Sequence, residues 1–242
     1  NATADVTIFL GDNITGNATA VQKENVKVTI IGNQKTYNGA IIVDGKSKRY
    51  ATAGLTIQNI SFSAENISEP AYINLGKSGN GNTRYTNNVT VKDCTFSTTS
   101  TKDVAAVKSY TGGDWNLNIS GCTVNEGMHS MLQVANVEKG LNIAGCKVYS
   151  KNGINLNNTP SLEMEGCTFD TKGYAIRVGV NGNTNNGVFN ISNSTLKSDC
   201  EDDDAVIILR GNMAGSTLNL TNTTVTGTLQ YTNESNATIN VM

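Results

Sequence analysis

Apolar and polar residues alternate in short segments along most of this chain, which is the period of a β-strand with one buried face. One such segment recurs seven times as an octapeptide close to LNISGCTV. The copies begin at residues 55, 89, 117, 141, 162, 189 and 218. No segment shows a sustained 3.6-residue apolar period, which excludes helical repeats. The pattern therefore predicts an all-β chain built from stacked repeats.

The fifth position of the octapeptide predicts a sharp bend in the backbone. Only residues that tolerate a left-handed conformation occur there: Asn59, Asp93, Gly121, Gly145, Gly166, Asn193 and Asn222. We therefore expect each copy to form two short strands joined at this residue.

A third strand is predicted after a turn in each repeat. These segments are 71–75, 104–108, 130–134, 153–157, 174–178, 205–209 and 229–231. Three strands and three turns per repeat describe a parallel β-solenoid with a filled interior and roughly eight to nine rungs. We expect it to span 26–242 and to continue or be capped beyond that range, with 1–25 forming an N-terminal cap or a first partial rung.

The repeat resembles the right-handed, single-stranded parallel β-helix of the pectate-lyase-like superfamily, over residues 26–242. By that resemblance, segments such as AIRV (175–178) form the first sheet, LNI (117–119) the second and CTV (122–124) the third. The superfamily includes lyases, hydrolases, phage tailspikes and adhesins, so the resemblance predicts the fold and leaves the activity open.

The sixth position of the octapeptide is predicted to face inward and holds four of the five cysteines: Cys94, Cys122, Cys146 and Cys167. Ser194 and Thr223 continue the same column. Neighbouring side chains in such a ladder lie about 4.8 Å apart, whereas the Cβ atoms of a disulfide lie about 3.8 Å apart. We therefore predict buried free thiols that pack as small apolar residues, rather than the disulfides of a secreted chain. Cys200 is expected to be a lone loop thiol.

Charge argues against two classes of partner. The chain has 18 Lys and Arg against 20 Asp and Glu, and charged residues make up 16% of it. Nucleic-acid and anionic-membrane surfaces need clustered Lys and Arg, so neither is expected. No apolar run approaches the roughly 20 residues that span a bilayer, which predicts no membrane insertion.

The resemblance implies that a substrate would lie along the outer face of the first sheet. By alternation the outward residues there are Asn74, Ala106, Gln133, Asn155, Arg177, Ile208 and Gln230. None is a carboxylate, whereas the superfamily's calcium-dependent lyases carry several on this face beside a basic residue. The GHG and RIK motifs of polygalacturonase-type hydrolases are also missing from the sequence. The catalytic candidates that remain are Arg177 and two turn carboxylates, Asp170 and Glu201.

The acidic run 199–204 suggests a second kind of site. Asp202 and Asp204 could supply oxygen ligands to Ca²⁺, although their spacing matches no known calcium loop. A solvated loop is the alternative interpretation. No other cofactor is expected. The single histidine, His129, is interpreted as an ordinary loop residue.

Aromatic residues in glycine-rich turns suggest carbohydrate recognition. Tyr85, Tyr110 and Trp115 are predicted to expose rings that stack on sugars, while Gln133, Asn155 and Arg177 bind hydroxyl groups. The alternative is that these rings only cap the side of the rod. A row of outward amides on the second sheet is interpreted as structural: Asn118, Asn142, Asn190 and Asn219, interrupted by Glu163.

The sequence therefore favours a secreted or cell-surface module of bacterial type that binds a polysaccharide or glycan, or serves adhesion. A polysaccharide lyase or glycoside hydrolase with an atypical site is the first alternative. A structural stalk that presents neighbouring domains of a larger surface protein is the second. The chain carries no recognisable catalytic set, so enzymatic activity is left open with a preference for none.

Overall fold

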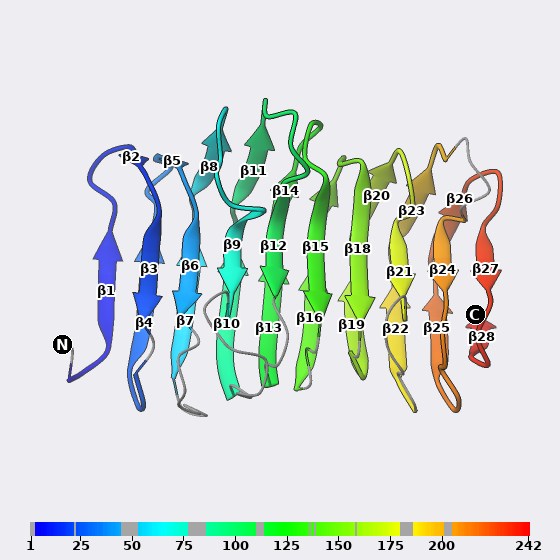
Figure 1. The fold of residues 1–242 in the computed structure, drawn as a ribbon. Coiled ribbons are helices and arrows are strands. Elements are labelled where there is room, and N and C mark those ends of the chain that lie inside the picture. Colours follow the sequence, from blue (N-terminus) through cyan, green and yellow to red (C-terminus); the bar gives the residue numbers. More distant parts are fainter. Residues whose placement is uncertain are drawn as a thin grey trace.

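The chain folds into a right-handed parallel β-helix, as the repeat predicts (Figure 1). The computed structural model describes residues 3–21, 23–44, 53–76, 86–109, 114–135, 137, 139–157, 159–179, 186–200 and 205–242. All regular structure in this part of the chain is β-strand. Each rung contributes one strand to the second sheet, then one to the third sheet and one to the first. Successive rungs stack from the N-terminal to the C-terminal end.

Within the described residues, the three sheets contain ten, nine and nine strands. The second sheet comprises β1 (Val6–Phe9), β4 (Lys27–Ile31), β7 (Gly54–Gln58), β10 (Thr86–Lys92), β13 (Asp114–Ser120), β16 (Gly140–Ala144), β19 (Ser161–Glu165), β22 (Val188–Ser192), β25 (Thr217–Thr221) and β28 (Thr238–Val241). The third sheet comprises β2 (Ile14–Thr15), β5 (Thr36–Asn38), β8 (Ser61–Ala64), β11 (Thr95–Thr98), β14 (Thr123–Val124), β17 (Lys147–Val148), β20 (Thr168–Thr171), β23 (Thr195–Ser198) and β26 (Thr224–Thr226). The first sheet comprises β3 (Ala18–Val21), β6 (Ile41–Asp44), β9 (Ala71–Leu75), β12 (Ala105–Ser109), β15 (Ser130–Ala135), β18 (Asn152–Asn157), β21 (Ile176–Val178), β24 (Ile207–Leu209) and β27 (Tyr231–Asn233).

The first 25 residues carry one strand of each sheet. Strands β1, β2 and β3 pair in parallel with β4, β5 and β6 of the following rung. The segment expected to be a cap or a partial rung therefore forms a full rung. Nine rungs of three strands follow one another, and β28 adds a tenth strand to the second sheet.

The left-handed bends between the second and third sheets are confirmed. Every residue predicted to bend has a positive φ: Asn59 (57°), Asp93 (51°), Gly121 (61°), Gly145 (61°), Gly166 (62°), Asn193 (51°) and Asn222 (48°). Glycine tolerates this region because it has no Cβ, and asparagine and aspartate tolerate it because their short polar side chains can hydrogen-bond locally. The octapeptide thus encodes one corner of the rod.

Apolar side chains fill the interior, and aromatic rings stack along the third sheet. The rings of Phe62 and Phe96 are parallel, with centroids 5.0 Å apart. Tyr37 and Tyr72 pack against Phe62 at tilted angles. Because the same column is filled rung after rung, the rod has a solid core.

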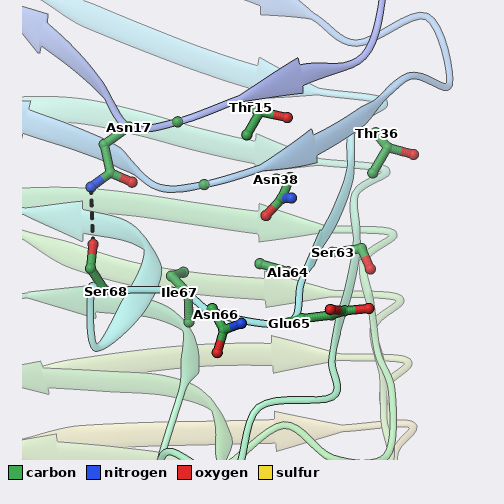
Figure 2. A pocket seen from close by; sticks show the side chains of 12 residues that line it. Thr15, Asn17, Thr36, Asn38, Ser63, Ala64, Glu65, Asn66, Ile67 and Ser68 are labelled. Atoms are coloured by element: carbon green, nitrogen blue, oxygen red, sulfur yellow. Dashed lines mark hydrogen bonds between the residues drawn. The ribbon is translucent and has the colours of Figure 1, made fainter.

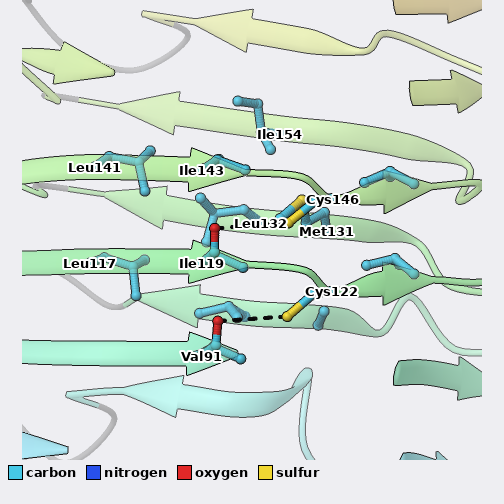
Figure 3. Packing of buried hydrophobic residues seen from close by; sticks show 14 of the residues in the cluster. Val91, Leu117, Ile119, Cys122, Met131, Leu132, Leu141, Ile143, Cys146 and Ile154 are labelled. Atoms are coloured by element: carbon cyan, nitrogen blue, oxygen red, sulfur yellow. Dashed lines mark hydrogen bonds between the residues drawn. The ribbon is translucent and has the colours of Figure 1, made fainter. Parts of the chain in front are cut away.

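The cysteine ladder is also confirmed (Figure 3). Cys94, Cys122, Cys146 and Cys167 are buried and free. Each thiol lies near two backbone carbonyls, one two residues earlier and one in the preceding rung. For Cys122 these are the oxygens of Ser120, at 3.4 Å, and Val91, at 3.6 Å. The column continues through Ser194, whose hydroxyl accepts the backbone N–H of Cys167 at 3.1 Å.

The outward amides of the second sheet form hydrogen bonds between rungs. Asn142 donates to the amide oxygen of Asn118 at 2.9 Å, and Asn190 donates to Oε1 of Glu163 at 2.7 Å. Asn219 donates to Asn190 at 2.8 Å, and Asn240 donates to Asn219 at 2.8 Å. These side chains satisfy one another along the stack.

No helix in the described part of the chain is both long enough and apolar enough to cross a membrane.

Candidate functional site

The candidate site is a row of polar side chains on the outer face of the first sheet. Strand pairing places Lys108, Gln133, Asn155 and Arg177 at one register position of four consecutive strands, β12, β15, β18 and β21. All four are partly exposed. Adjacent strands are about 4.8 Å apart, so the row is about 14 Å long. The three residues predicted to bind sugar, Gln133, Asn155 and Arg177, are therefore neighbours.

The prediction that Ala106 faces outward on β12 was wrong. Ala106 is buried in the core, and so is the next residue, Val107. Two successive residues thus face inward at the start of this strand, and strict alternation fails there. Lys108, which pairs with Asn74 and Gln133, takes the outward position.

The prediction that Gln230 is the outward residue of the last first-sheet strand was also wrong. Gln230 precedes β27, and its amide donates to the backbone oxygen of Val225 at 3.1 Å. Thr232, inside the strand, occupies the register position next to Ile208. The last strand starts two residues later than its apolar pattern predicted.

Arg177 is held by two contacts. Its Nε donates to the amide oxygen of Asn155 at 3.4 Å, and its Cζ lies 4.3 Å from the centre of the Tyr174 ring. Tyr174 is 4% exposed and packs with Ala205 and Ile208 in a small apolar cluster separate from the core. The guanidinium is therefore positioned on the sheet rather than extended into solvent.

Buried residues bound the row at both ends. Asn74, next to Lys108, is 0% exposed, and its amide donates to the backbone oxygen of Ala71 at 2.7 Å. Ile208, next to Arg177, is also 0% exposed. In this column of the described residues, the uninterrupted run of polar, partly exposed side chains therefore extends from Lys108 to Arg177.

Trp115 is not part of this surface. Its side chain is 1% exposed, and it belongs to the hydrophobic core. Strand β13 begins three residues before the octapeptide, so Trp115 shares the inward face with Leu117 and Ile119. The prediction of an exposed, sugar-stacking ring at this position is therefore wrong.

Asp170, the other described catalytic candidate, does not lie beside Arg177. Asp170 lies on β20 of the third sheet, where it pairs with Lys197 at 3.1 Å. Lys197 also lies 3.2 Å from Asp199, and the carboxylates of Asp170 and Asp199 raise the pKa of Lys197. Tyr85, Tyr110, Glu201, Asp202 and Asp204 lie outside the described residues.

His129 has a carboxylate partner that the sequence did not suggest. Its Nδ1 lies 2.9 Å from Oδ1 of Asp103, which comes from the turn of the preceding rung. The His129 side chain is 17% exposed, and that of Asp103 is 75% exposed. Within the described ranges, no group of three or more His, Cys, Asp or Glu side chains could hold a metal ion.

A polar groove lies at the corner between the third and first sheets of the first three rungs (Figure 2). It has a volume of about 570 Å³. Thr15, Asn38 and Ser63 line one side, and the segment 64–68 lines the other. No sequence motif pointed to it, because its residues come from three different rungs.

No protein-family model matches this chain, and the curated proteins compared with it include no match.

Proposed function

We propose that the chain is a secreted or cell-surface β-helix module that binds carbohydrate, with a polymer lying along the first sheet. The observation that supports this most is the row of Gln133, Asn155 and Arg177 at one register position of successive strands. The resemblance of the repeat to the pectate-lyase-like superfamily supports the same placement of the ligand. A repeating row suits a repeating ligand, because each rung can contact a successive part of the polymer.

The row has the chemistry of sugar recognition. The amides of Gln133 and Asn155 each offer donors and an acceptor to hydroxyl groups. The guanidinium of Arg177 suits a carboxylate on an acidic sugar. Because Tyr174 and Asn155 already orient Arg177, a ligand would lose less side-chain entropy on binding.

Binding is preferred to catalysis because the row contains no carboxylate. Glycoside hydrolysis generally needs a pair of carboxyl groups on either side of the scissile bond. Asp170, the described carboxylate that the sequence suggested, is paired with Lys197 on another sheet.

Retention on immobilised polysaccharides tests the proposal. Polygalacturonate and a neutral glucan would be compared, and Arg177→Ala and Asn155→Ala should each weaken retention on the polymer that is bound. Thr232→Ala, beyond the buried Ile208 in the same column, is the matched control. Equal retention of the wild type and both row variants would contradict the proposal, and so would no retention on either polymer. Assays of reducing ends and unsaturated products, with Ca²⁺ and with chelator, test the enzymatic alternative.

A further inference from the structure

The corner groove of the first three rungs is built differently from the row of Arg177. Its floor comes from two tight corners that use only two residues each, 16–17 after β2 and 39–40 after β5. Gly16 has a φ of +109°, and a Cβ at Gly39 would overlap the carbonyl oxygen of Gly16. Because glycine has no Cβ, the two corners can stack closely, and no side chain from these positions fills the groove.

The wall comes from a longer connection. Six residues, 65–70, join β8 to β9 in the third rung. Ile67 is 2% exposed and packs into the core, which fixes the middle of the segment. The next residue, Ser68, accepts the side-chain amide of Asn17 at 3.4 Å, so the wall is joined to the first rung (Figure 2). Asn17 is itself fixed, since its oxygen accepts the backbone N–H of Ala40 at 2.9 Å.

The groove offers polar groups that the protein does not use. Within the described residues, the side chains of Thr15, Asn38, Ser63 and Asn66 make no hydrogen bond. They supply hydroxyl and amide groups that can both donate and accept. Glu65 is the one ionisable residue that lines the groove, so the charge it presents is negative. An anionic ligand is disfavoured, and a ligand with many uncharged hydroxyl groups fits.

We propose that this groove is a second binding site, specific for a neutral mono- or disaccharide unit. Its volume of about 570 Å³ falls within the range of ligand pockets, roughly 300–1,000 Å³. The anchored wall is present before binding, so little ordering is required. The site is separate from the Arg177 row and does not depend on it.

Titrations followed by amide NMR test this site. The probes are methyl α-D-glucopyranoside, methyl β-D-galactopyranoside, methyl α-D-mannopyranoside, N-acetylglucosamine and maltose, with galacturonate as the anionic comparison. At least one neutral probe should shift the side-chain amide signals of Asn38 and Asn66. Asn38→Ala should weaken that binding about fivefold, as expected for one lost hydrogen bond.

Two further variants separate the site from general effects on the fold. Ser68→Ala removes the hydrogen bond that ties the wall to Asn17 and a hydroxyl that lines the groove, so it should weaken binding while the spectrum stays folded. Thr195→Ala, on the exposed face of the same sheet, should leave binding unchanged. Arg177→Ala should also leave it unchanged, even where that variant abolishes retention on a polymer.

Three results would overturn the inference. The first is that no neutral probe shifts the Asn38 and Asn66 amides. The second is that galacturonate binds as tightly as the neutral sugars. The third is that Asn38→Ala and Ser68→Ala bind like the wild type.

Discussion

The guanidinium carbon of Arg177 lies 4.3 Å from the centre of the Tyr174 ring, three residues earlier in the same rung. Tyr174 is buried against Ala205 and Ile208 on the outer side of the first sheet. A cation over a ring in a partly covered setting is stabilised by about 0.5–1 kcal/mol. This contact positions the guanidinium at one end of the polar row.

A double-mutant cycle between these two residues should therefore show coupling. We expect Arg177→Ala and Tyr174→Leu together to destabilise the protein by about 0.5–1 kcal/mol less than the sum of the single variants. Urea denaturation measures the free energies of unfolding of the wild type, the two single variants and the double variant. Tyr174→Phe is the control, because it keeps the ring and should preserve the coupling. Additive effects would show that the contact contributes nothing.

The left-handed corner can be tested at Gly145. A Cβ there would meet no atom within 4 Å, so substitution tests backbone strain alone. Asparagine already occupies the equivalent position in three other rungs, at 59, 193 and 222. We expect Gly145→Asn to be nearly neutral and Gly145→Val to lower the free energy of unfolding by about 1–2 kcal/mol or more.

Gly121→Asn is the contrasting variant. A Cβ at this position would overlap Oδ1 of Asp93 in the preceding rung, so the exposed Asp93 side chain must rotate away in addition to the backbone strain. It should cost more than Gly145→Asn in the same denaturation experiment. Equal costs for asparagine and valine at position 145 would contradict the assigned role of the bend.

Local rules account for most of the fold that the sequence predicted. The bends, the inward thiols and the strands of the second and third sheets each depend on residues within one octapeptide, and seven copies of the octapeptide make these signals clear. Which side chains belong to the polar row depends on where each strand of the first sheet starts and on which of its residues face outward. Lys108 was missed because Ala106 and Val107 both face inward, which breaks the alternation. The sequence did contain a signal for the outward position of Lys108: an apolar residue followed by a polar one, as in Val107–Lys108 and Leu132–Gln133.

Non-local contacts account for the other misses. Trp115 lies in a glycine-rich stretch that looked like a loop, yet β13 begins at Asp114 because its backbone pairs with β10. The corner groove needs Asn17 of the first rung to meet Ser68 of the third, which no local pattern encodes. Such contacts between rungs depend on the lengths of the turns and on how the rungs stack.

The thiol ladder should make stability depend on pH in the alkaline range. Hydrogen bonding to the thiols of Cys146 and Cys94, together with burial, raises the pKa of the Cys122 thiol. The folded protein therefore keeps this proton, whereas the unfolded chain loses it above its ordinary pKa of about 8.5. The stabilisation is complete below that pH and falls as the pH rises further.

We expect the free energy of unfolding to fall between pH 8 and pH 10, by about 1–2 kcal/mol more in the wild type than in Cys122→Ala. Titrations outside the ladder are common to both proteins and cancel in the difference, whereas Cys94 and Cys146 lose their hydrogen-bonding partner together with Cys122. Thiol labelling gives a second check, since Cys200 is the partly exposed thiol and should react first. All five cysteines should become reactive on unfolding without reductant. Parallel pH profiles would contradict the prediction.

The amide row of the second sheet should be sensitive to a second carboxylate. Asn190 donates to Oε1 of Glu163 at 2.7 Å, in the adjacent strand. Asn190→Asp removes this hydrogen bond and places two like charges opposite each other, which is destabilising. Asn219→Asp is the matched control. It also loses one donated bond, to Asn190, but its column neighbours Asn190 and Asn240 are neutral.

At pH 7 we expect Asn190→Asp to lower the free energy of unfolding by about 1 kcal/mol more than Asn219→Asp. Repulsion between the two carboxylates favours their protonated forms in the folded protein. Stability is therefore greatest below the unfolded carboxyl pKa of about 4 and is lost as the pH rises. The difference between the two variants should shrink at pH 3, measured by urea denaturation. If the difference stays the same at both pH values, the lost hydrogen bond, and not charge repulsion, causes the lower stability of Asn190→Asp.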